Sequence, residues 1–210
     1  MGFYPLFVEL DGRPCVVLGG GVVAERKVLG LLAAGAVVTV VSPALTHGLA
    51  ALARAGRIAH VMRAYAGGDL AGAALAFAAT DDGAINAAVA AEGRARGIWV
   101  NAADDPANCD VILPAVVRRG PVTVAIGTGG ATPAVARAVR EHVERALPAA
   151  WASLAEIARD LRRELGARAE QRPSADAWRD ALAEALPPLL AGETREDAAR
   201  RLRERLTACA

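Results

Sequence analysis

Residues 15–24, CVVLGGGVVA, join an apolar run to three consecutive glycines and to the start of a helix-like segment. Their order fits the pattern G-x-G-x-x-A, in which alanine takes the place of a third glycine. We expect a buried strand over Cys15–Leu18, a tight turn at Gly19 and a helix from Val22. Gly21 would let a pyrophosphate approach the backbone, where the helix N-terminus offers free N–H groups and a positive dipole. The pattern predicts dinucleotide binding; the alternative is a glycine-rich turn with only a packing role.

Length, composition and net charge limit the kinds of protein that this chain can be. The chain has 210 residues, 54% of them apolar and 4% aromatic, with a formal net charge of +1. This length suits one large domain or two small ones, and the charge argues against a general nucleic-acid binder. No apolar stretch reaches membrane-spanning length without glycine, proline or charge, and the first residues do not resemble a secretory signal. We therefore expect a soluble, cytoplasmic protein that binds neither nucleic acid nor membrane.

The cysteines and histidines predict no metal site. Cys15, Cys109 and Cys209 are far apart and form no C-x-x-C pair, so neither a disulfide framework nor a zinc site is indicated. We expect Cys15 to be a buried strand residue and Cys109 to have a packing role. The three histidines share no ligand spacing.

Strand and helix patterns alternate as far as residue 113, which indicates an α/β domain with a parallel sheet and helices on both faces. Further strands are expected over Val37–Val41, Ile58–Met62, Ala74–Ala79, Ile98–Asn101 and Val111–Leu113. Thr46 would cap one helix, and Asp81 or Asp82 would cap another that ends at Gly97. This part of the chain, residues 1–113, is the predicted Rossmann-type domain.

The pattern changes after Pro114. Ala115–Arg118 and Val122–Ile126 are typical of a hairpin, and Thr132 can cap the helix that follows. The remainder is helical and amphipathic, with expected breaks at Pro173, Pro187-Pro188 and Gly192. We predict a linking segment over residues 114–147 and a small all-helical domain over residues 148–210.

The carboxyl ends of parallel strands are where a dinucleotide binds, so polar residues there are candidates. Ser42 follows the second strand, where NAD-binding domains often carry an acid for the ribose hydroxyls. The acid is absent and no arginine follows directly, so Ser42 favours NAD over NADP only mildly. Thr80 could contact the cofactor, whereas the two aspartates after it mainly suggest a helix cap.

Asp104 and Asp105 follow the next strand, in the stretch NAADDP at residues 101–106. Two carboxylates beside a nicotinamide would be placed for proton transfer, and repulsion or burial could raise the pKa of one of them. The alternative is a turn, because aspartate before proline is common in loops.

A second glycine-rich stretch, GTGG at residues 127–130, precedes the helix that Thr132 caps. It could form an anion cradle, and Arg118, Arg119 and Arg137 lie close to it in the sequence. This combination suits a carboxylate-rich substrate; the alternative is a hinge between domains.

Four ordered blocks resemble the precorrin-2 dehydrogenase family, which forms the dehydrogenase and ferrochelatase part of siroheme synthases. The blocks are residues 19–27 (GGGVVAERK), 78–82 (AATDD), 100–106 (VNAADDP) and 122–137, and the opening Tyr4–Phe7 is similar as well. The resemblance is strong over residues 1–147, and in the helical tail it concerns only position and character. It implies NAD-dependent oxidation of precorrin-2 to sirohydrochlorin and, in some members, Fe(II) insertion at the same site to give siroheme.

The resemblance also implies a homodimer, with residues 1–113 binding NAD and residues 114–147 forming a dimerisation segment. It assigns the shared acid–base role to Asp104 and places a serine that some relatives phosphorylate at Thr128. The cofactor contacts that it and the glycine pattern imply are Gly19, Gly21, Val22, Val23, Ser42, Pro43, Ala44 and Thr80. Precorrin-2 carries many carboxylates, for which the expected partners are Thr128, Gly129, Gly130, Arg118 and Arg137.

Two other functions fit the residues. One is a non-catalytic NAD-sensing module, whose dimer reports redox state through the helical domain. It would need neither Asp104 nor the glycine-rich stretch at residues 127–130. The other, weaker one is an oxidoreductase that acts on a different polycarboxylate. Any iron would be a transient substrate of this chain, because no histidine or cysteine cluster marks a permanent site.

Overall fold

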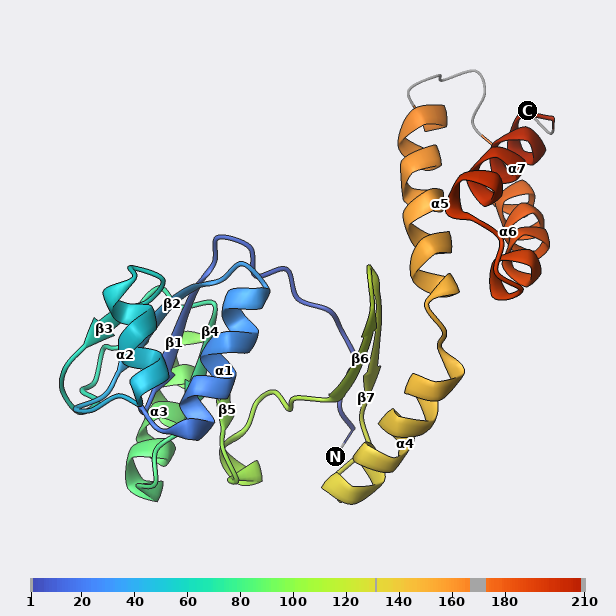
Figure 1. Ribbon diagram of the computed structural model, residues 1–210. Coiled ribbons are helices and arrows are strands. Elements are labelled where there is room, and N and C mark those ends of the chain that lie inside the picture. The colour runs from blue at the N-terminus through green and yellow to red at the C-terminus, as the bar shows by residue number, and fades with distance from the viewer. Residues whose placement is uncertain (1, 131, 167–172, 209–210) are drawn as a thin grey trace. The chain divides into compact units, whose positions relative to one another are not determined.

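The structure is a computed structural model that describes residues 2–130, 132–166 and 173–208 (Figure 1). The chain divides into two compact units. One consists of residues 3–113, and the other of residues 114–210 with the first two residues. The domain roles expected from the sequence, including dimerisation by residues 114–147, stay predictions, because compactness assigns no role to a unit. Cys209 lies outside the described residues.

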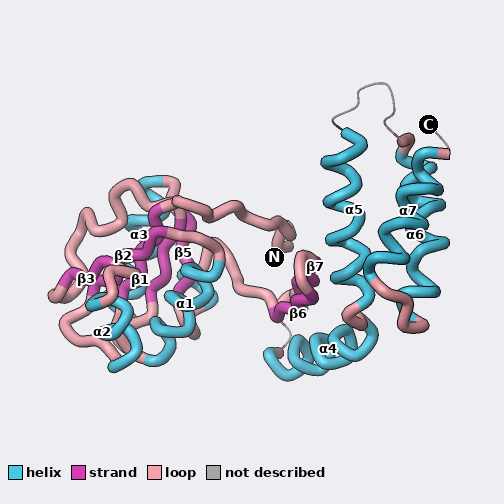
Figure 2. The backbone as a smooth tube through the Cα atoms, turned by 45° about the horizontal axis from the view of Figure 1, so that its top comes forward, coloured by secondary structure: helices cyan, strands magenta, loops and turns pink. Residues whose placement is uncertain are grey.

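A five-stranded parallel sheet forms the centre of the first unit, with its strands drawn in magenta in Figure 2. The strand order is β3–β2–β1–β4–β5. The strands are β1 (Pro14–Leu18), β2 (Val37–Val41), β3 (Ala59–Val61), β4 (Leu75–Ala78) and β5 (Trp99–Ala102). Leu18 is in register with Val41 on one side and with Ala78 on the other, so the central strands end at one level. The order reverses direction beside β1, which is where a doubly wound sheet leaves a crevice for a ligand.

Helices cover both faces of this sheet, as the alternating pattern predicted. They are α1 (Val22–Ala33), α2 (His47–Arg54) and α3 (Gly83–Arg96). Val28 of α1 and Leu49 of α2 belong to the core on one face, whereas Val89 of α3 belongs to the core on the other. Gly97 ends α3 in the left-handed conformation, with φ of 69°, where glycine is unstrained. The result is a three-layer α/β unit of the Rossmann type.

The strand expected over Val111–Leu113 is wrong. The chain instead forms a short 3-10 helix, η1 (Pro106–Asn108), and then an irregular segment. The amides of Asp110 and Val111 both donate to the carbonyl oxygen of Val100, at 2.8 and 3.3 Å. Two consecutive amides that share one acceptor turn the chain across the sheet edge, whereas a strand would direct alternate amides to the ladder.

The second unit begins with an antiparallel hairpin of β6 (Ala115–Arg119) and β7 (Val122–Ile126). The hairpin packs beside α4 (Pro133–Ala146). The guanidinium of Arg119 donates to the carbonyl oxygens of Leu147 and Glu144, at 3.2 Å each, and so binds the hairpin to the end of α4. No residue of α4 is buried within the described chain.

Three helices complete this unit: α5 (Ala150–Gly166), α6 (Ala175–Leu190) and α7 (Arg195–Thr207). The amphipathic character expected of this part of the chain is confirmed on α5, because Leu154, Ile157, Leu161 and Leu165 are all buried. They share a core with residues of α6 and α7, among them Leu202 and Leu206. In the described part of the chain, no helix is both long and apolar enough to span a bilayer.

The break expected at Pro187-Pro188 is wrong, because both prolines lie inside α6. Proline lacks an N–H group and normally interrupts a helix. Here only one turn remains, and it is supported because the amide of Ala191 donates to the carbonyl oxygens of Pro187 and Pro188. Leu189 is buried in the three-helix core. Tertiary packing of that side chain therefore outweighs the local preference of the prolines.

Candidate functional site

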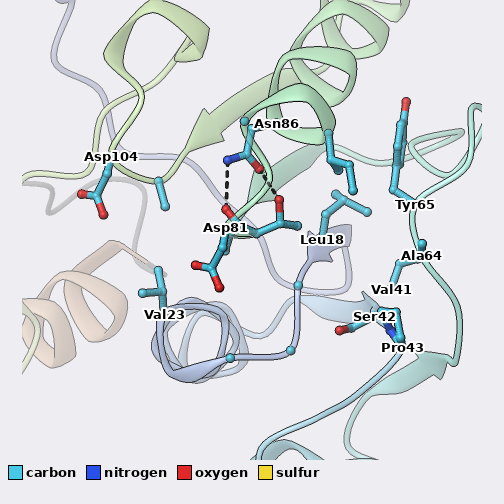
Figure 3. Close-up of a pocket in the computed structure, with 18 of the residues that line it drawn as sticks. Leu18, Val23, Val41, Ser42, Pro43, Ala64, Tyr65, Asp81, Asn86 and Asp104 are labelled. Carbon is cyan, nitrogen blue, oxygen red and sulfur yellow. Dashed lines mark hydrogen bonds between the residues drawn. The ribbon is translucent and has the colours of Figure 1, made fainter.

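A pocket of about 770 Å³ lies at the carboxyl ends of the strands in the first unit (Figure 3). Its wall comes from the segments that follow β1, β2, β3, β4 and β5. Figure 3 shows Asp104 and Val23 on one side of the pocket, and Ser42, Pro43 and Tyr65 on the other. The pocket is therefore elongated across the strand ends, as a dinucleotide requires.

The glycine loop forms the floor of the pocket. Gly19 has φ of 117°, and a Cβ atom there would lie 2.2 Å from the carbonyl oxygen of Ala79. A Cβ at Gly20 would lie 1.9 Å from the carbonyl oxygen of Ala44. These two positions accept only glycine because strand ends pack against the loop. The tightest of the three, Gly20, is the middle residue that the G-x-G pattern leaves unspecified.

Gly21 differs, because a Cβ there would meet no atom of the described residues within 4 Å. It is the N-cap of α1, and no side chain in the described part of the chain caps this helix end. The first amides of a helix lack intrahelical partners, so α1 directs N–H groups and its positive dipole end toward this side of the pocket. Ala24 is completely buried against the sheet, which is the role expected of the alanine in the pattern. Open space beside uncapped amides fits a pyrophosphate.

Ser42 is 7% exposed and lines the pocket, but its hydroxyl already has a partner. The hydroxyl donates to the carbonyl oxygen of Ala44 at 2.7 Å. The carbonyl oxygen of Ser42 contacts His60 Nε2 at 2.9 Å. Pro43 lines the pocket, whereas Ala44 is not among the lining residues of the described chain. Ala44 instead holds Ser42 and packs against Gly20.

Thr80 also lines the pocket, at the N-terminal end of α3. Its hydroxyl donates to Asn86 Oδ1 at 2.9 Å, and Asn86 Nδ2 donates to the carbonyl oxygen of Thr80 at 3.0 Å. Asp82 accepts from the amides of Ala84 and Ile85, so it is the predicted helix cap. Asn86, a buried polar side chain in this wall, was not among the residues predicted for the site. Its position one turn into the helix after the TDD triplet is the signal that could have identified it.

Asp104 lines the pocket with an exposed side chain, and its backbone is left-handed, with φ of 57°. Such a φ is uncommon outside glycine, although aspartate tolerates it better than most residues. The loop is held by Cys109, whose Sγ lies 3.2 Å from the amide nitrogen and 3.1 Å from the carbonyl oxygen of Ala102. Asp105 is engaged locally, because its carboxylate accepts from Asn108 Nδ2 at 2.7 Å. Both carboxylates line the pocket, but Asp105 is half-buried and bonded to Asn108, whereas Asp104 is exposed.

Lys27 is the only lysine of the chain, and the sequence analysis gave it no role. It extends from α1 over the ring of Phe77, with 5.6 Å between its Nζ and the ring centroid. Burial, followed by the charge of Arg26, lowers the pKa of Lys27, while the charges of Cys109 and Asp104 act to raise it. The Lys27 ammonium is therefore coupled electrostatically to the loop that carries Asp104. One lysine among many arginines was the signal available in the sequence.

The five residues expected to bind substrate all belong to the second unit, whereas the pocket belongs to the first. They are Arg118 on β6, Thr128, Gly129 and Gly130 before α4, and Arg137 on α4. Arg118 and Arg137 are exposed. The hydroxyl of Thr132 already accepts from the amide of Val135 at 3.2 Å and so caps α4. The role of the five residues in substrate binding stays a prediction. Among the described residues, no group of three or more acidic, histidine or cysteine side chains could hold a metal ion.

Comparison with known proteins agrees with this geometry. Residues 6–115 match the family described as "Putative NAD(P)-binding". The chain is 47% identical to the siroheme synthase of Ectopseudomonas mendocina over 162 residues, which are 77% of this chain and 35% of that protein. It is 41% identical to the siroheme synthase of Methylococcus capsulatus over 211 residues, which are 100% of this chain and 44% of that protein. The chain thus spans less than half the length of these relatives.

A solved structure has the same fold. It is described as "SirC, precorrin-2 dehydrogenase", and it matches with a TM-score of 0.75 at 23% identity, covering 96% of this chain and all of that one. At this identity the likeness concerns the fold. Membership of the family rests on the sequence matches, and the family match includes the glycine loop and the Asp104 loop. The chain therefore belongs to the NAD(P)-binding family that the match describes, and it is a homologue of the siroheme synthases, in agreement with the resemblance of its sequence blocks.

Proposed function

We propose that this chain catalyses the NAD-dependent oxidation of precorrin-2 to sirohydrochlorin, a step of siroheme biosynthesis. The observation that carries the proposal is the presence of the Asp104 side chain in the same pocket as the uncapped N-terminus of α1. Kinship with siroheme synthases supports the choice of substrate. The same pocket without an ionisable group would favour a sensor of NAD over an enzyme.

The residues of the pocket suit an extended NAD molecule. Ser42, Pro43 and Tyr65 would hold the adenosine half, and Gly21 with the first amides of α1 would hold the pyrophosphate. The nicotinamide half would then lie toward Val23 and Asp104. When bound, NAD supplies a hydride acceptor. Precorrin-2 loses a hydride and a proton in this oxidation, so the chain itself must provide for the proton.

Asp104 is the group that we assign to this proton. Its carboxylate is exposed and lines the pocket, so it can accept a proton from a substrate carbon or nitrogen beside the nicotinamide. Burial lowers the pKa of the Lys27 ammonium, whereas the charge of Asp104 acts to raise it. Cys109 keeps the loop in place, and burial raises the pKa of its own thiol, which disfavours a nucleophilic thiolate.

Substrate recognition and assembly are further parts of the proposal. The substrate's carboxylates would meet the exposed Arg118 and Arg137 and the stretch Thr128–Gly130. We also propose a homodimer that pairs through α4. This helix exposes Val135 and Val139, at 46% and 39%. The two valines are four residues apart, so they lie on one face and form the apolar stripe of this helix. An amphipathic helix without a partner for its apolar side is typical of an interface.

The decisive experiment measures NADH formation from NAD⁺ and precorrin-2 by wild type and Asp104→Asn. Asparagine has the shape of aspartate and tolerates positive φ, so the loop should keep its geometry while the base is lost. We expect the rate to fall at least a hundredfold with NAD⁺ affinity unchanged. Equal rates would remove Asp104 from the mechanism. NAD⁺ binding without any NADH formation by wild type would favour the sensor.

Iron insertion into sirohydrochlorin is a second candidate activity, because the relatives are named as siroheme synthases. The exposed Asp104 carboxylate could accept the pyrrole protons that Fe(II) displaces. Adding Fe(II) and sirohydrochlorin to the purified protein, and following the absorption spectrum, tests this activity. A spectrum that changes no faster than without protein would contradict it.

A further inference from the structure

The adenosine side of the pocket carries no positive charge. Ser42, Pro43, Ala64 and Tyr65 form this side, and all four are uncharged. In the lining as a whole, the described residues include carboxylates but neither lysine nor arginine. NADP differs from NAD by a phosphate on the adenosine ribose, which adds nearly two negative charges. Such a phosphate usually requires an arginine near the end of the second strand.

An arginine does lie beside this side of the pocket. The strands β2 and β3 are parallel, with Val41 in register with Val61. The amides of Ser42 and Arg63 both donate to the carbonyl oxygen of Val61, at 3.1 and 2.9 Å. Because the two amides share one acceptor, the backbone of Arg63 lies next to that of Ser42. Arg63 also precedes two residues of the pocket wall, Ala64 and Tyr65.

The guanidinium of Arg63 is already engaged by Asp69. Arg63 Nη1 donates to Asp69 Oδ2 at 2.7 Å, and Nη2 donates to Oδ1 at 2.6 Å. This is the paired geometry with which arginine would otherwise bind a phosphate. Asp69 is itself held, because its carboxylate accepts from the amide of Ala66 at 2.9 Å and its side chain is only 11% exposed. The hydrogen bond from Arg63 lowers the pKa of Asp69. At physiological pH both side chains are therefore charged, and their two charges cancel.

We propose that Asp69 makes the pocket selective for NAD over NADP by occupying Arg63. The inference rests on the proposed dinucleotide site and deepens it. With Asp69 present, the ribose phosphate of NADP meets a paired arginine and a nearby carboxylate. Without the carboxylate, Arg63 is released to form a bidentate contact with that phosphate. NAD has no group at this position, so its affinity is indifferent to the change.

The test is equilibrium titration of the full chain with NAD⁺ and with NADP⁺, by calorimetry. The variant is Asp69→Asn, which keeps an oxygen for the Ala66 amide and loses the charge. We expect wild type to bind NAD⁺ at least tenfold more tightly than NADP⁺. In Asp69→Asn, the affinity for NADP⁺ should rise at least tenfold, and that for NAD⁺ should stay within twofold. Adding Arg63→Ala to this variant should abolish the gain.

Asp176→Asn is the matched control, because it removes a carboxylate paired with an arginine, Arg179, in the other unit. It should leave both affinities unchanged, so a gain there would assign the effect to net charge and overturn the inference. An unchanged NADP⁺ affinity in a folded Asp69→Asn protein would overturn it too, as would equal affinities in wild type. Should Asp69→Asn fail to fold, Asp69→Ala serves in its place. If wild type binds NAD⁺ and Asp69→Asn changes neither affinity, only this inference is contradicted. If wild type binds neither dinucleotide, the proposed function is contradicted as well.

Discussion

A methyl group at Gly20 would lie 1.9 Å from the carbonyl oxygen of Ala44, whereas one at Gly21 would have open space around it. We therefore expect Gly20→Ala to destabilise the fold by about 1–3 kcal/mol, since backbone must move to relieve the overlap. Gly21→Ala should cost only about 0.5–1 kcal/mol, because Gly21 is the N-cap of α1, where alanine is less favourable than glycine. It should nevertheless weaken NAD⁺ binding at least tenfold, because the methyl group would occupy the space assigned to the pyrophosphate.

Thermal unfolding and NAD⁺ titration of both variants separate these two effects. Each substitution adds the same methyl group, so each variant is the control for the other. Normal NAD⁺ affinity in Gly21→Ala would show that the phosphates do not pass over this residue. A Gly20→Ala protein as stable as wild type would contradict the close approach of Ala44.

For single residues, the sequence indicates much of the site, and the residues that it does not indicate share a common cause. The glycine pattern, the Asp82 cap and the Asp104 loop are local signals, and the structure has the helix, the cap and the pocket where these signals predicted them. Gly20 is constrained by the carbonyl group of Ala44, in the segment that follows β2, and Lys27 reaches its neighbours through tertiary packing. Neither contact leaves a periodicity or a spacing in the sequence.

Among the elements, α3 anchors the segment that precedes β4. Glu92 of α3 accepts hydrogen bonds from the hydroxyl of Tyr65 at 2.6 Å and from the amides of Gly68 and Leu70 at 3.0 and 3.3 Å. Burial by itself would raise the pKa of Glu92, but these hydrogen bonds together lower it. Burial, and then the hydrogen bond to Glu92, raise the pKa of Tyr65 to about 12. The Glu92 carboxylate of α3 therefore holds the segment that carries Tyr65, a residue of the pocket wall.

Glu92→Ala should lower the free energy of unfolding by about 1–3 kcal/mol, because the buried Leu70 loses the acceptor of its amide and the half-buried Tyr65 loses that of its hydroxyl. The lowered pKa of Glu92 means that its stabilising effect is present above pH 4.5 and is lost as the pH falls through the folded pKa. The raised pKa of Tyr65 acts at the other end, where stability is present below pH 10 and is lost as the pH rises toward 12. Denaturant unfolding of both proteins from acid to alkaline pH measures these windows.

Tyrosine absorbance gives an independent reading. The chain has two tyrosines, so a Tyr4→Phe background isolates Tyr65. In that background we expect Tyr65 to titrate near pH 12, and Glu92→Ala should lower its pKa. Glu92→Gln, which keeps an acceptor oxygen, should be the milder variant. A stability difference between wild type and Glu92→Ala that persists unchanged into acid would contradict this role of the carboxylate.

The elements themselves follow closely from local patterns, and the exceptions arise from packing. Val111–Leu113 has the composition of a strand, yet the sharing of one carbonyl by two amides at that edge prevents a ladder. The prolines at 187 and 188 should end a helix, yet burial of Leu189 retains the final turn. One error concerns a three-residue strand that does not form and the other the last turn of a helix, and in both cases one contact outweighs a weak local preference.

In the whole molecule, the residues of the proposed reaction are divided between the two units. The pocket with Asp104 belongs to residues 3–113, and the arginines expected to bind the substrate belong to residues 114–210. The sequence indicates both sets, because each follows a recognisable local pattern. It does not show how a polycarboxylate would contact both sets at once, since that depends on the assembly and not on any one element.

Assembly is testable through α4, the helix with no buried residue in the described chain. If two copies pair through its apolar stripe, each valine buried contributes about 1.5 kcal/mol. Val135→Asp with Val139→Asp should therefore raise the dimer dissociation constant at least a hundredfold. Both side chains are exposed, so the fold of each copy should keep its unfolding temperature. Sedimentation velocity over a range of concentrations measures the effect. Arg137→Asp, which places an aspartate on the opposite, exposed face of α4, should remain dimeric. Wild type that sediments as a monomer would contradict the dimer. A double variant that stays dimeric would show that the interface lies elsewhere.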